Sequence, residues 1–212
     1  CRNSRSLQPR PAHPPPALLR LAAALQLSLR GTSCIYQGDE LGLPEAEIAF
    51  EDMQDPYGLT MWPEFKGRDG CRTPMPWNTA AADLGFGSGA ARPWLPLAPS
   101  HRALAVAAQE ADPNSLLHHY RHLLKWRRGH PALIDGEMVL LAPHPQVLAY
   151  ERRGSGERLL CAFNLSESES LFKLPAGLAV ADVLADSGAA GATLQAGKVA
   201  FAPWGVLFAR LS

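Results

Sequence analysis

The sequence has no excess of charge of either sign and no long uninterrupted apolar run. Lys and Arg together number 20, and so do Asp and Glu. This balance gives no electrostatic reason to expect nucleic acid or an anionic membrane as a partner, and an uncharged substrate fits it at least as well. The longest apolar run, residues 18–29, is interrupted by Arg20, Gln26 and Ser28 and falls short of a membrane span. We therefore expect no nucleic-acid partner and no membrane partner.

Cysteine is scarce, and its four copies are widely spaced, at positions 1, 34, 71 and 161. No Cys-x-x-Cys pair is present, which argues against a zinc cluster or a thioredoxin-type site. We expect reduced, mostly buried thiols and a cytoplasmic location, because cytosolic proteins rarely contain disulfides. No signal peptide is visible, but the chain does not begin with Met, so this observation says little about export.

Features that bind cofactors or metals are missing as well. There is no Gly-rich phosphate loop and no Gly-x-Ser-x-Gly nucleophile elbow. His118 and His122 have the i, i+4 spacing of a metal pair, but no third ligand is adjacent in the sequence, so a solvated helix face is favoured. The sequence predicts no cofactor and no bound metal.

The first segments of the chain predict a lead-in, a helix and a strand. Residues 1–16 contain five prolines and few apolar residues, which indicates an extended or disordered segment. Residues 17–29 are rich in Ala and Leu and lie between Pro and Gly, so they predict a largely buried helix. Residues 32–37 form a β-prone run that is typical of a strand covered on both faces, as in a parallel sheet.

Residues 38–113 are rich in Gly, Pro, Asp and Trp and show little periodicity. A loop of this length inside a compact domain is usually functional. Short helical turns are expected near residues 51–54 and 101–110, the second capped by Ser100. Residues 114–128 repeat Leu and Tyr at helical spacing and end in a basic turn, which predicts a second helix.

From residue 132 onward, short β-prone runs alternate with turns. Their regular spacing predicts an antiparallel β-sandwich, with a domain boundary near residue 131. The predicted strands are 137–141, 147–152, 158–164, 170–174, 180–184, 198–202 and 206–211.

Two long motifs are the most informative part of the sequence. The first is GTSCIYQGDELG at residues 31–42, and the second is FKGRDGCRTPMPW at residues 65–77. They resemble the bacterial α-glucosidases, including the oligo-1,6-glucosidases, of the α-amylase-like glycoside hydrolase family. The intervening FEDMQDPYG at residues 50–58 is also similar to this subgroup. The resemblance spans residues 17–212.

The resemblance implies a fold of the class α/β plus all-β, in which a (β/α)8 TIM barrel is followed by an antiparallel β-sandwich. Residues 17–131 would be the last part of the catalytic barrel, and residues 132–212 the C-terminal sandwich. Within the barrel portion, residues 17–30 would be the seventh helix, residues 32–37 the eighth strand and residues 114–129 the last helix. Barrel enzymes build their sites from loops at the C-terminal ends of the strands, which is where the long loop begins.

The resemblance makes Arg68 the first candidate for substrate binding. In relatives the matching Arg lies at the innermost sugar subsite, pairs with an Asp on an early barrel loop and helps to hold the non-reducing glucose. A guanidinium suits this role because it binds a carboxylate and a sugar hydroxyl in fixed geometry. Arg72 is the second candidate, and Asp69 is expected to orient these arginines. The alternative, a structural Arg that bridges loop carboxylates, stays open.

Three further residues, Tyr36, Gln37 and Glu40, end the expected strand near the floor of the site. Glu40 is expected to accept hydrogen bonds from loop backbone or an arginine rather than to catalyse. Aromatic residues of the loop are expected to serve as core, with stacking against sugar C–H groups as the alternative. They are Trp62, Phe65 and Trp77.

The family's catalytic carboxylates are missing. Retaining glycosidases need two carboxyl groups about 5 Å apart, and the resemblance places them, with a third acid, N-terminal to residue 17. Residues 1–16 contain no Asp or Glu. We therefore assign no catalytic residue. We expect the C-terminal part of a retaining α-glucosidase that hydrolyses terminal α-linked glucose from short oligosaccharides, and we expect this chain to be inactive alone.

Two other functions stay open. One is a non-catalytic carbohydrate-binding or accessory module that uses the sandwich and the Trp-rich loop. The other is a portion of a related transglycosidase or of a sucrose isomerase that makes trehalulose or isomaltulose. The expected partner of the full-length protein is an α-glucosidic oligosaccharide.

Overall fold

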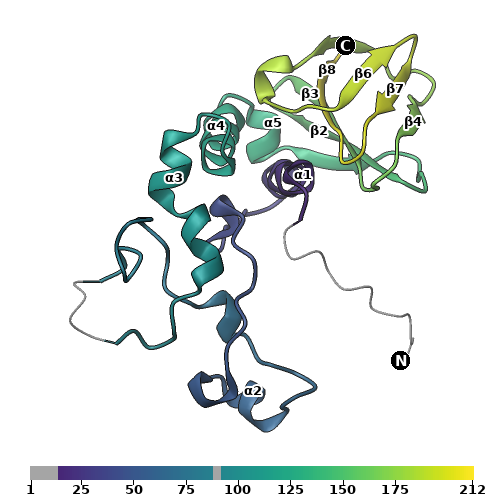
Figure 1. The fold of residues 1–212 in the computed structure, drawn as a ribbon. Coiled ribbons are helices and arrows are strands. Elements are labelled where there is room, and N and C mark those ends of the chain that lie inside the picture. Colours follow the sequence, from purple (N-terminus) through teal and green to yellow (C-terminus); the bar gives the residue numbers. More distant parts are fainter. Residues whose placement is uncertain (1–13, 88–91) are drawn as a thin grey trace. The chain divides into compact units, whose positions relative to one another are not determined.

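The structure, a computed structural model, describes residues 14–87 and 92–212 (Figure 1). These residues form two compact units, one made of residues 35–118 and the other of residues 15–34 and 119–212. No helix within the described part of the chain has the length and apolar character needed to cross a bilayer.

The unit of residues 35–118 consists of short helical segments joined by irregular loops. Its helical segments are α2 (Pro56–Thr60), α3 (Val106–Ala111) and the 3-10 turns Asp39–Leu41, Phe50–Asp52, Asp69–Cys71 and Pro99–Leu104. The predicted turns near 51–54 and 101–110 are confirmed. The predicted cap Ser100 is wrong, because Pro99 already starts the turn and the cap position is Ala98, without a side-chain hydrogen bond.

Buried apolar side chains and buried polar contacts hold this unit together. The buried cluster consists of Ala46, Ile48, Met53 and Ala98. Gln109 adds a bridge, since its Nε2 donates to the Leu41 carbonyl at 2.8 Å and its Oε1 accepts from the Leu117 N–H at 3.1 Å. Further apolar side chains of this unit are buried outside that cluster, among them Leu41, Leu84 and Leu95.

The predicted strand at residues 32–37 does not form. None of these residues belongs to a sheet, and Cys34, Tyr36 and Gln37 are exposed. A strand persists only where its N–H and C=O groups pair with a neighbour, and every strand pairing of the described residues lies within residues 137–211. The prediction of a buried strand is therefore wrong in this chain, because no partner strand pairs with it.

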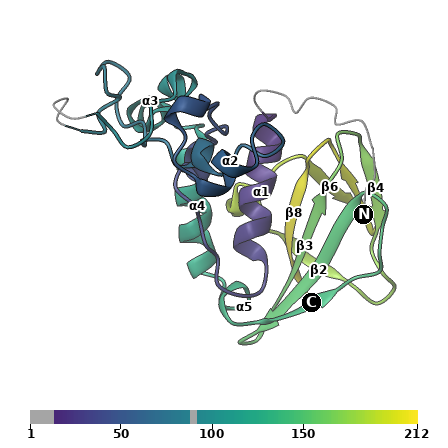
Figure 2. The same cartoon turned by 90° about the horizontal axis from the view of Figure 1, so that it is seen from below.

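The second unit combines helices with a β-sandwich (Figures 1 and 2). Its helices are α1 (Pro16–Ser28), most of α4 (Leu116–Arg128) and α5 (Pro131–Ile134). The helices predicted at 17–29 and 114–128 are thereby confirmed. Ser115 caps α4, since its Oγ accepts from the His118 N–H at 3.3 Å. The lead-in predicted at residues 1–16 lies largely outside the described residues.

Eight strands form two antiparallel sheets, in the orders β1-β2-β3-β8-β5 and β4-β7-β6. The strands are β1 (Glu137–Leu140), β2 (Val147–Gly154), β3 (Glu157–Asn164), β4 (Ser170–Lys173), β5 (Val180–Val183), β6 (Ala192–Gln195), β7 (Lys198–Phe201) and β8 (Val206–Leu211). The predicted antiparallel sandwich is confirmed, and each predicted run matches a strand. Only β6, an edge strand of the three-stranded sheet, was not predicted.

Apolar side chains from both sheets fill the space between them. The alternation is clearest in β7, where Val199 and Phe201 are buried and Lys198 and Ala200 are exposed. The buried members of this core are Val147, Ala149, Leu160, Ala162, Phe172, Leu174, Val199, Phe201, Leu207, Ala209 and Leu211.

Helix α1 is attached to the sandwich through its C-terminal turn. Ser28 Oγ and the Tyr150 hydroxyl lie 2.7 Å apart, and both groups are buried. Arg152, which is fully buried on β2, donates from Nη1 to the Ser28 carbonyl at 2.6 Å. A cation beside the last carbonyls of a helix also complements the helix dipole. The two views show α1 lying beside the five-stranded sheet (Figures 1 and 2).

Not all histidines of α4 are solvated. His118 is half-buried and His122 is exposed, but His119 is only 7% exposed. Its Nδ1 lies 3.4 Å from Arg20 Nη1 on α1, and its buried Nε2 has no hydrogen-bond partner in the part of the chain that the structure describes. Burial first, and then the positive charge of Arg20, lower the pKa of His119 from 6.5 to about 4.

The lowered pKa of His119 predicts a loss of stability in mild acid. Between pH 6.5 and pH 4 the unfolded chain binds a proton at this site and the folded chain does not, so stability is complete above pH 6.5 and falls as the pH approaches 4. We expect the free energy of unfolding to drop by about 2 kcal/mol from pH 7 to pH 5 through this group. In His119→Gln, the free energy of unfolding measured with urea should fall by about 2 kcal/mol less between pH 7 and pH 5 than in the unmodified chain. His118→Gln is the control, and an equal flattening in both variants would contradict the assignment.

Candidate functional site

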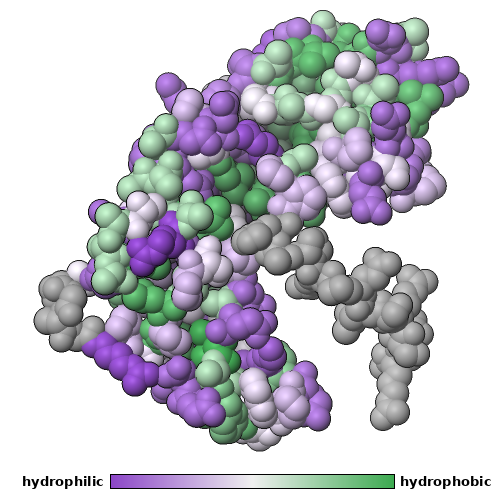
Figure 3. All heavy atoms as spheres, viewed as in Figure 1, coloured by the Kyte–Doolittle hydropathy of each residue, from purple (hydrophilic) through white to green (hydrophobic). Residues whose placement is uncertain are grey.

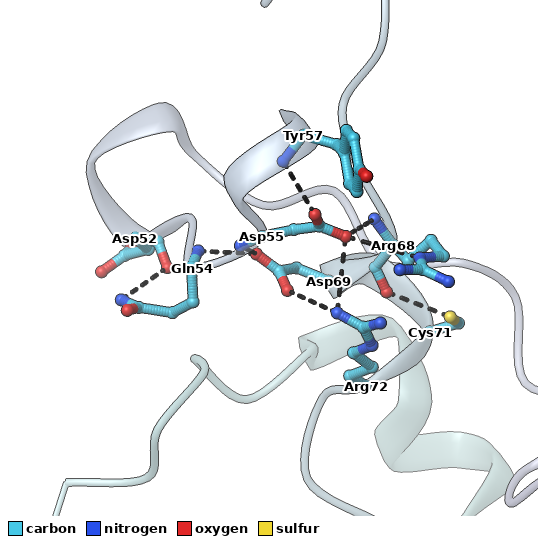
Figure 4. A network of polar contacts seen from close by, with 8 residues as sticks. All are labelled: Asp52, Gln54, Asp55, Tyr57, Arg68, Asp69, Cys71 and Arg72. Carbon is cyan, nitrogen blue, oxygen red and sulfur yellow. Dashed lines mark hydrogen bonds and ion pairs between the residues drawn. The ribbon is translucent and has the colours of Figure 1, made fainter. Parts of the chain in front are cut away.

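Four charged residues of the loop meet in one network (Figure 4). Asp69 is completely buried, and its Oδ2 accepts from the backbone N–H groups of Gln54 at 2.6 Å and Asp55 at 2.8 Å. Asp69 thereby connects the 3-10 turn that carries it to the segment that starts α2. The contact crosses fifteen residues of the chain and closes the loop on itself.

Asp55 is the second buried carboxylate, with 2% of its surface exposed. Its Oδ1 caps α2 by accepting from the Tyr57 N–H at 3.0 Å, and its Oδ2 accepts from the Arg68 N–H at 3.0 Å. Burial opposes ionisation of Asp55. The two N–H groups and the charges of Arg68 and Arg72 outweigh burial, so the pKa of Asp55 lies below its ordinary value.

The two arginines contact these carboxylates differently. Arg72 Nη1 lies 3.4 Å from Asp55 Oδ2 and 3.6 Å from Asp69 Oδ1, and its side chain is 31% exposed. Arg68 approaches Asp55 only through Nε, at 3.6 Å, and its side chain is 62% exposed. Arg72 is thus held between two carboxylates, whereas neither Nη group of Arg68 has a hydrogen bond within the described residues.

Sequence reasoning did not single out Asp55. A signal was present in the Asp55-Pro56 pair, because Asp at the cap position followed by Pro at the first helical position is typical of a helix start. The burial of Asp55 was not predictable, since it depends on contacts with residues 68–72.

Asp55 and Asp69 do not form a catalytic acid pair. Each carboxylate already accepts two backbone N–H groups, and each lies beside Arg72. Both carboxylates are thus engaged in holding the loop, whereas a retaining glycosidase needs one carboxyl group as acid and one open to act as nucleophile. Asp39 and Glu40, which are consecutive in the sequence, also accept backbone hydrogen bonds. Asp39 accepts from the Tyr36 N–H at 3.0 Å, and Glu40 accepts from the Gly38 N–H at 2.9 Å.

The residues predicted to support the site lie elsewhere in this unit. Tyr36 and Gln37 line a cavity of about 220 Å³ together with Cys71 and Thr73. Glu40 does not line this cavity and bonds to loop backbone. Tyr36 and Gln37 therefore share a cavity with the neighbours of Arg72 in the sequence, Cys71 and Thr73.

The loop aromatics are not core residues. Trp62, Phe65 and Trp77 are all exposed, so the core interpretation is wrong for them. Trp62 packs against Phe50 with ring centroids 5.6 Å apart. Hydrophobic residues reach the visible surface of this unit (Figure 3).

Two of the three described thiols are exposed as well. Cys34 and Cys71 are exposed and Cys161 is buried, all three as free thiols. The prediction of mostly buried thiols is therefore wrong for this part of the chain. No group of three or more potential metal ligands occurs among residues 14–87 and 92–212.

Comparison with known proteins assigns both parts of the chain. A family model described as "Alpha amylase, catalytic domain" matches residues 15–136, and one described as "Maltogenic Amylase, C-terminal domain" matches residues 138–207. A curated "Probable alpha-glucosidase" of Rhizobium meliloti (strain 1021) is 47% identical over 193 residues, which cover 91% of this chain and 34% of the relative. An "Oligo-1,6-glucosidase" of Parageobacillus thermoglucosidasius is 31% identical over 175 residues, covering 74% of this chain and 31% of the relative. The chain spans about a third of the length of these relatives.

Solved structures agree with this assignment. The alpha-glucosyl transfer enzyme XgtA is 47% identical, with a TM-score of 0.86 over 93% of this chain and 36% of the XgtA chain. The trehalulose synthase MutB from Pseudomonas mesoacidophila MX-45 is 28% identical, with a TM-score of 0.80 over 98% of this chain and 40% of its own. The first family model covers more than half of the residues, and both units have their counterparts in these structures. The chain therefore belongs to the α-amylase family of glycoside hydrolases, with part of the catalytic domain followed by the C-terminal all-β domain.

Proposed function

We propose that this chain belongs to a retaining α-glucosidase that removes terminal α-linked glucose from short oligosaccharides. The observation that carries the proposal is the arginine pair on the buried Asp55–Asp69 framework. Arg72 is fixed by two carboxylates, and the exposed Arg68 beside it has Nη donors available for a sugar hydroxyl or a further carboxylate. The names of the curated relatives, α-glucosidase and oligo-1,6-glucosidase, support this substrate class.

The reacting carboxyl groups belong, in this proposal, to polypeptide outside these 212 residues. Both buried acids of the network are engaged by backbone donors, and a retaining mechanism needs a free nucleophile and an acid about 5 Å apart. We propose that residues 17–131 are the end of the catalytic barrel and residues 132–212 the sandwich domain. The 212-residue chain should not hydrolyse p-nitrophenyl-α-glucoside. The same chain joined to the upstream part of the Rhizobium meliloti relative should.

Glucosyl transfer is the second candidate, because the solved structure with 47% identity is named as a glucosyl transfer enzyme. A retaining enzyme forms a glucosyl intermediate that either water or a sugar hydroxyl can intercept. Product analysis of the joined protein on maltose and on sucrose separates the possibilities. Free glucose as the main product supports hydrolysis, a longer oligosaccharide supports transfer, and a rearranged disaccharide from sucrose supports isomerisation.

Arg68 and Arg72 should respond differently to substitution by Lys in the joined protein. Arg68→Lys should lower kcat/KM about 10- to 100-fold, the equivalent of one charged hydrogen bond, because Lys cannot reproduce the guanidinium fork. Its thermal midpoint should change little, since the Arg68 side chain is exposed. Arg72→Lys should lower both activity and stability. An unchanged kcat/KM in Arg68→Lys, with a large loss in Arg72→Lys, would assign the sugar contact to Arg72 instead.

A further inference from the structure

The three-stranded sheet of the sandwich ends in an edge strand, β4 (Figure 1). Among the described residues β4 pairs only with β7, where Ser170 lies opposite Phe201 and Lys173 lies opposite Lys198. The other side of an edge strand presents N–H and C=O groups with which a further strand can pair. Whether a further strand fits depends on the backbone groups and side chains along that side.

The backbone groups that point away from β7 are those of Leu171 and Lys173. The Leu174 N–H donates to the Gly197 carbonyl at 2.9 Å, and in an antiparallel ladder every second residue bonds to the same neighbour. Phe172, two residues before Leu174, therefore bonds to β7, whereas Leu171 and Lys173 face the open side. Their N–H and C=O groups form no hydrogen bond with any residue that the structure describes.

The exposed side chains of this edge carry opposite charges on either side of a leucine. Glu169 and Lys173 each lie two residues from Leu171, and all three are exposed, while Ser170 and Phe172 between them are buried. Side chains two residues apart on a strand share a face. Leu171 has 57% of its surface exposed, and neither charged side chain has an ion-pair partner among the described residues. The edge therefore offers an apolar centre flanked by one negative and one positive charge.

This pattern is complementary to itself when two copies of β4 run antiparallel. If Leu171 lies opposite Leu171 of a second copy, each Glu169 lies opposite a Lys173. Opposite charges in directly opposed positions stabilise an antiparallel pair, and like charges destabilise it. A parallel arrangement in the same register would instead place each charge opposite its own copy. The antiparallel pairing uses the same surface on both copies, which is the geometry of a closed two-fold dimer.

We propose that the β4 edge pairs with the β4 edge of a second copy of this chain. The Leu171 and Lys173 backbone groups exchange hydrogen bonds with the second copy, and the Glu169 carboxylates accept from the Lys173 ammonium groups. Charged residues at an edge usually discourage pairing, but here their arrangement permits one orientation and one register. A single short strand pair buries little area, so the dimer is weak and reversible. The proposal does not depend on the glucosidase assignment.

Sedimentation equilibrium of the 212-residue chain measures this association. The weight-average mass should rise from near the monomer value at about 10 µM toward the dimer value at about 500 µM. Lys173→Glu places two carboxylates opposite each other, and Glu169→Lys places two ammonium groups opposite each other. Each variant alone should weaken association at least about tenfold. Glu167→Lys makes the same charge change in the exposed bend before β4, and as the control it should associate like the unmodified chain.

Restoring the charge complementarity distinguishes the β4 edge from any other surface. The double variant with Glu169→Lys and Lys173→Glu reverses both charges and should associate like the unmodified chain. An equimolar mixture of the two single variants should form mixed dimers, because every ammonium group then faces a carboxylate. Circular dichroism establishes that each variant is folded. The proposal is overturned by an unmodified chain that stays monomeric at the highest concentration, by single variants that associate as strongly as the unmodified chain, or by a double variant that stays monomeric.

Discussion

Replacing Arg152 by methionine should destabilise the unit of residues 15–34 and 119–212 by about 3 kcal/mol. The guanidinium is fully buried and donates to three carbonyl oxygens, those of Ser28 at 2.6 Å, Gly136 at 3.0 Å and Glu137 at 3.4 Å. Burial is also the main reason that the pKa of Arg152 lies below its ordinary value. Hydrogen bonds from a charged donor contribute about 1.5–3 kcal/mol each. Part of the loss is offset, because methionine avoids the desolvation of a buried charge.

The structural consequence of losing Arg152 should be greatest at α1. Two of its three acceptors are the consecutive carbonyls of Gly136 and Glu137 at the start of β1, and the third is at the end of α1, so one side chain on β2 joins β2 to two other segments. Urea unfolding followed by circular dichroism measures the change. Arg210→Met, at an exposed position of β8, is the control and should shift the free energy of unfolding by no more than about 0.5 kcal/mol. Equal midpoints for Arg152→Met and the unmodified chain would contradict this role.

The local sequence pattern was sufficient to predict the two long helices and most strands of the sandwich. Helix α1 follows from an Ala- and Leu-rich stretch between Pro and Gly, and the strands follow from short β-prone runs between turn residues. Residues 32–37 are β-prone in the same way as those runs, but they form no strand. Whether such a run pairs depends on a neighbouring strand, and a local pattern carries no information about that neighbour.

In the candidate site, the sequence predicts contacts between residues close together in the chain and misses those that depend on the folding of the loop. Asp69 and Arg72 are three residues apart, so their proximity on a turn can be read from the sequence. Asp55 reaches them from fourteen residues away, and its burial emerges only when the loop closes. The cavity beside Cys71 needs three separated segments to converge, and sequence pattern does not specify such convergence.

Asp69 is the residue whose loss should disorganise the arginine site most. It is completely buried, and its carboxylate holds the N–H groups of Gln54 and Asp55 while facing Arg72. Asp69→Ala would leave the buried Asp55 N–H without an acceptor, at about 1–3 kcal/mol, would also release the partly buried Gln54 N–H, and would remove one partner of Arg72. We expect a loss of about 3 kcal/mol.

Hydrogen exchange and a matched variant would separate this positioning role from a general loss of folding. Amide exchange in Asp69→Ala should accelerate at Gln54 and Asp55, while amides of β3 in the other unit keep their protection. Asp52→Ala is the control, because Asp52 forms an ion pair with the exposed Arg92 and such surface pairs contribute about 0–1 kcal/mol. If the exchange of Gln54 and Asp55 is as slow in Asp69→Ala as in Asp52→Ala, Asp69 does not hold the loop. The fixed geometry of Arg72 must then depend on Asp55 alone, since Asp55 is its other carboxylate partner.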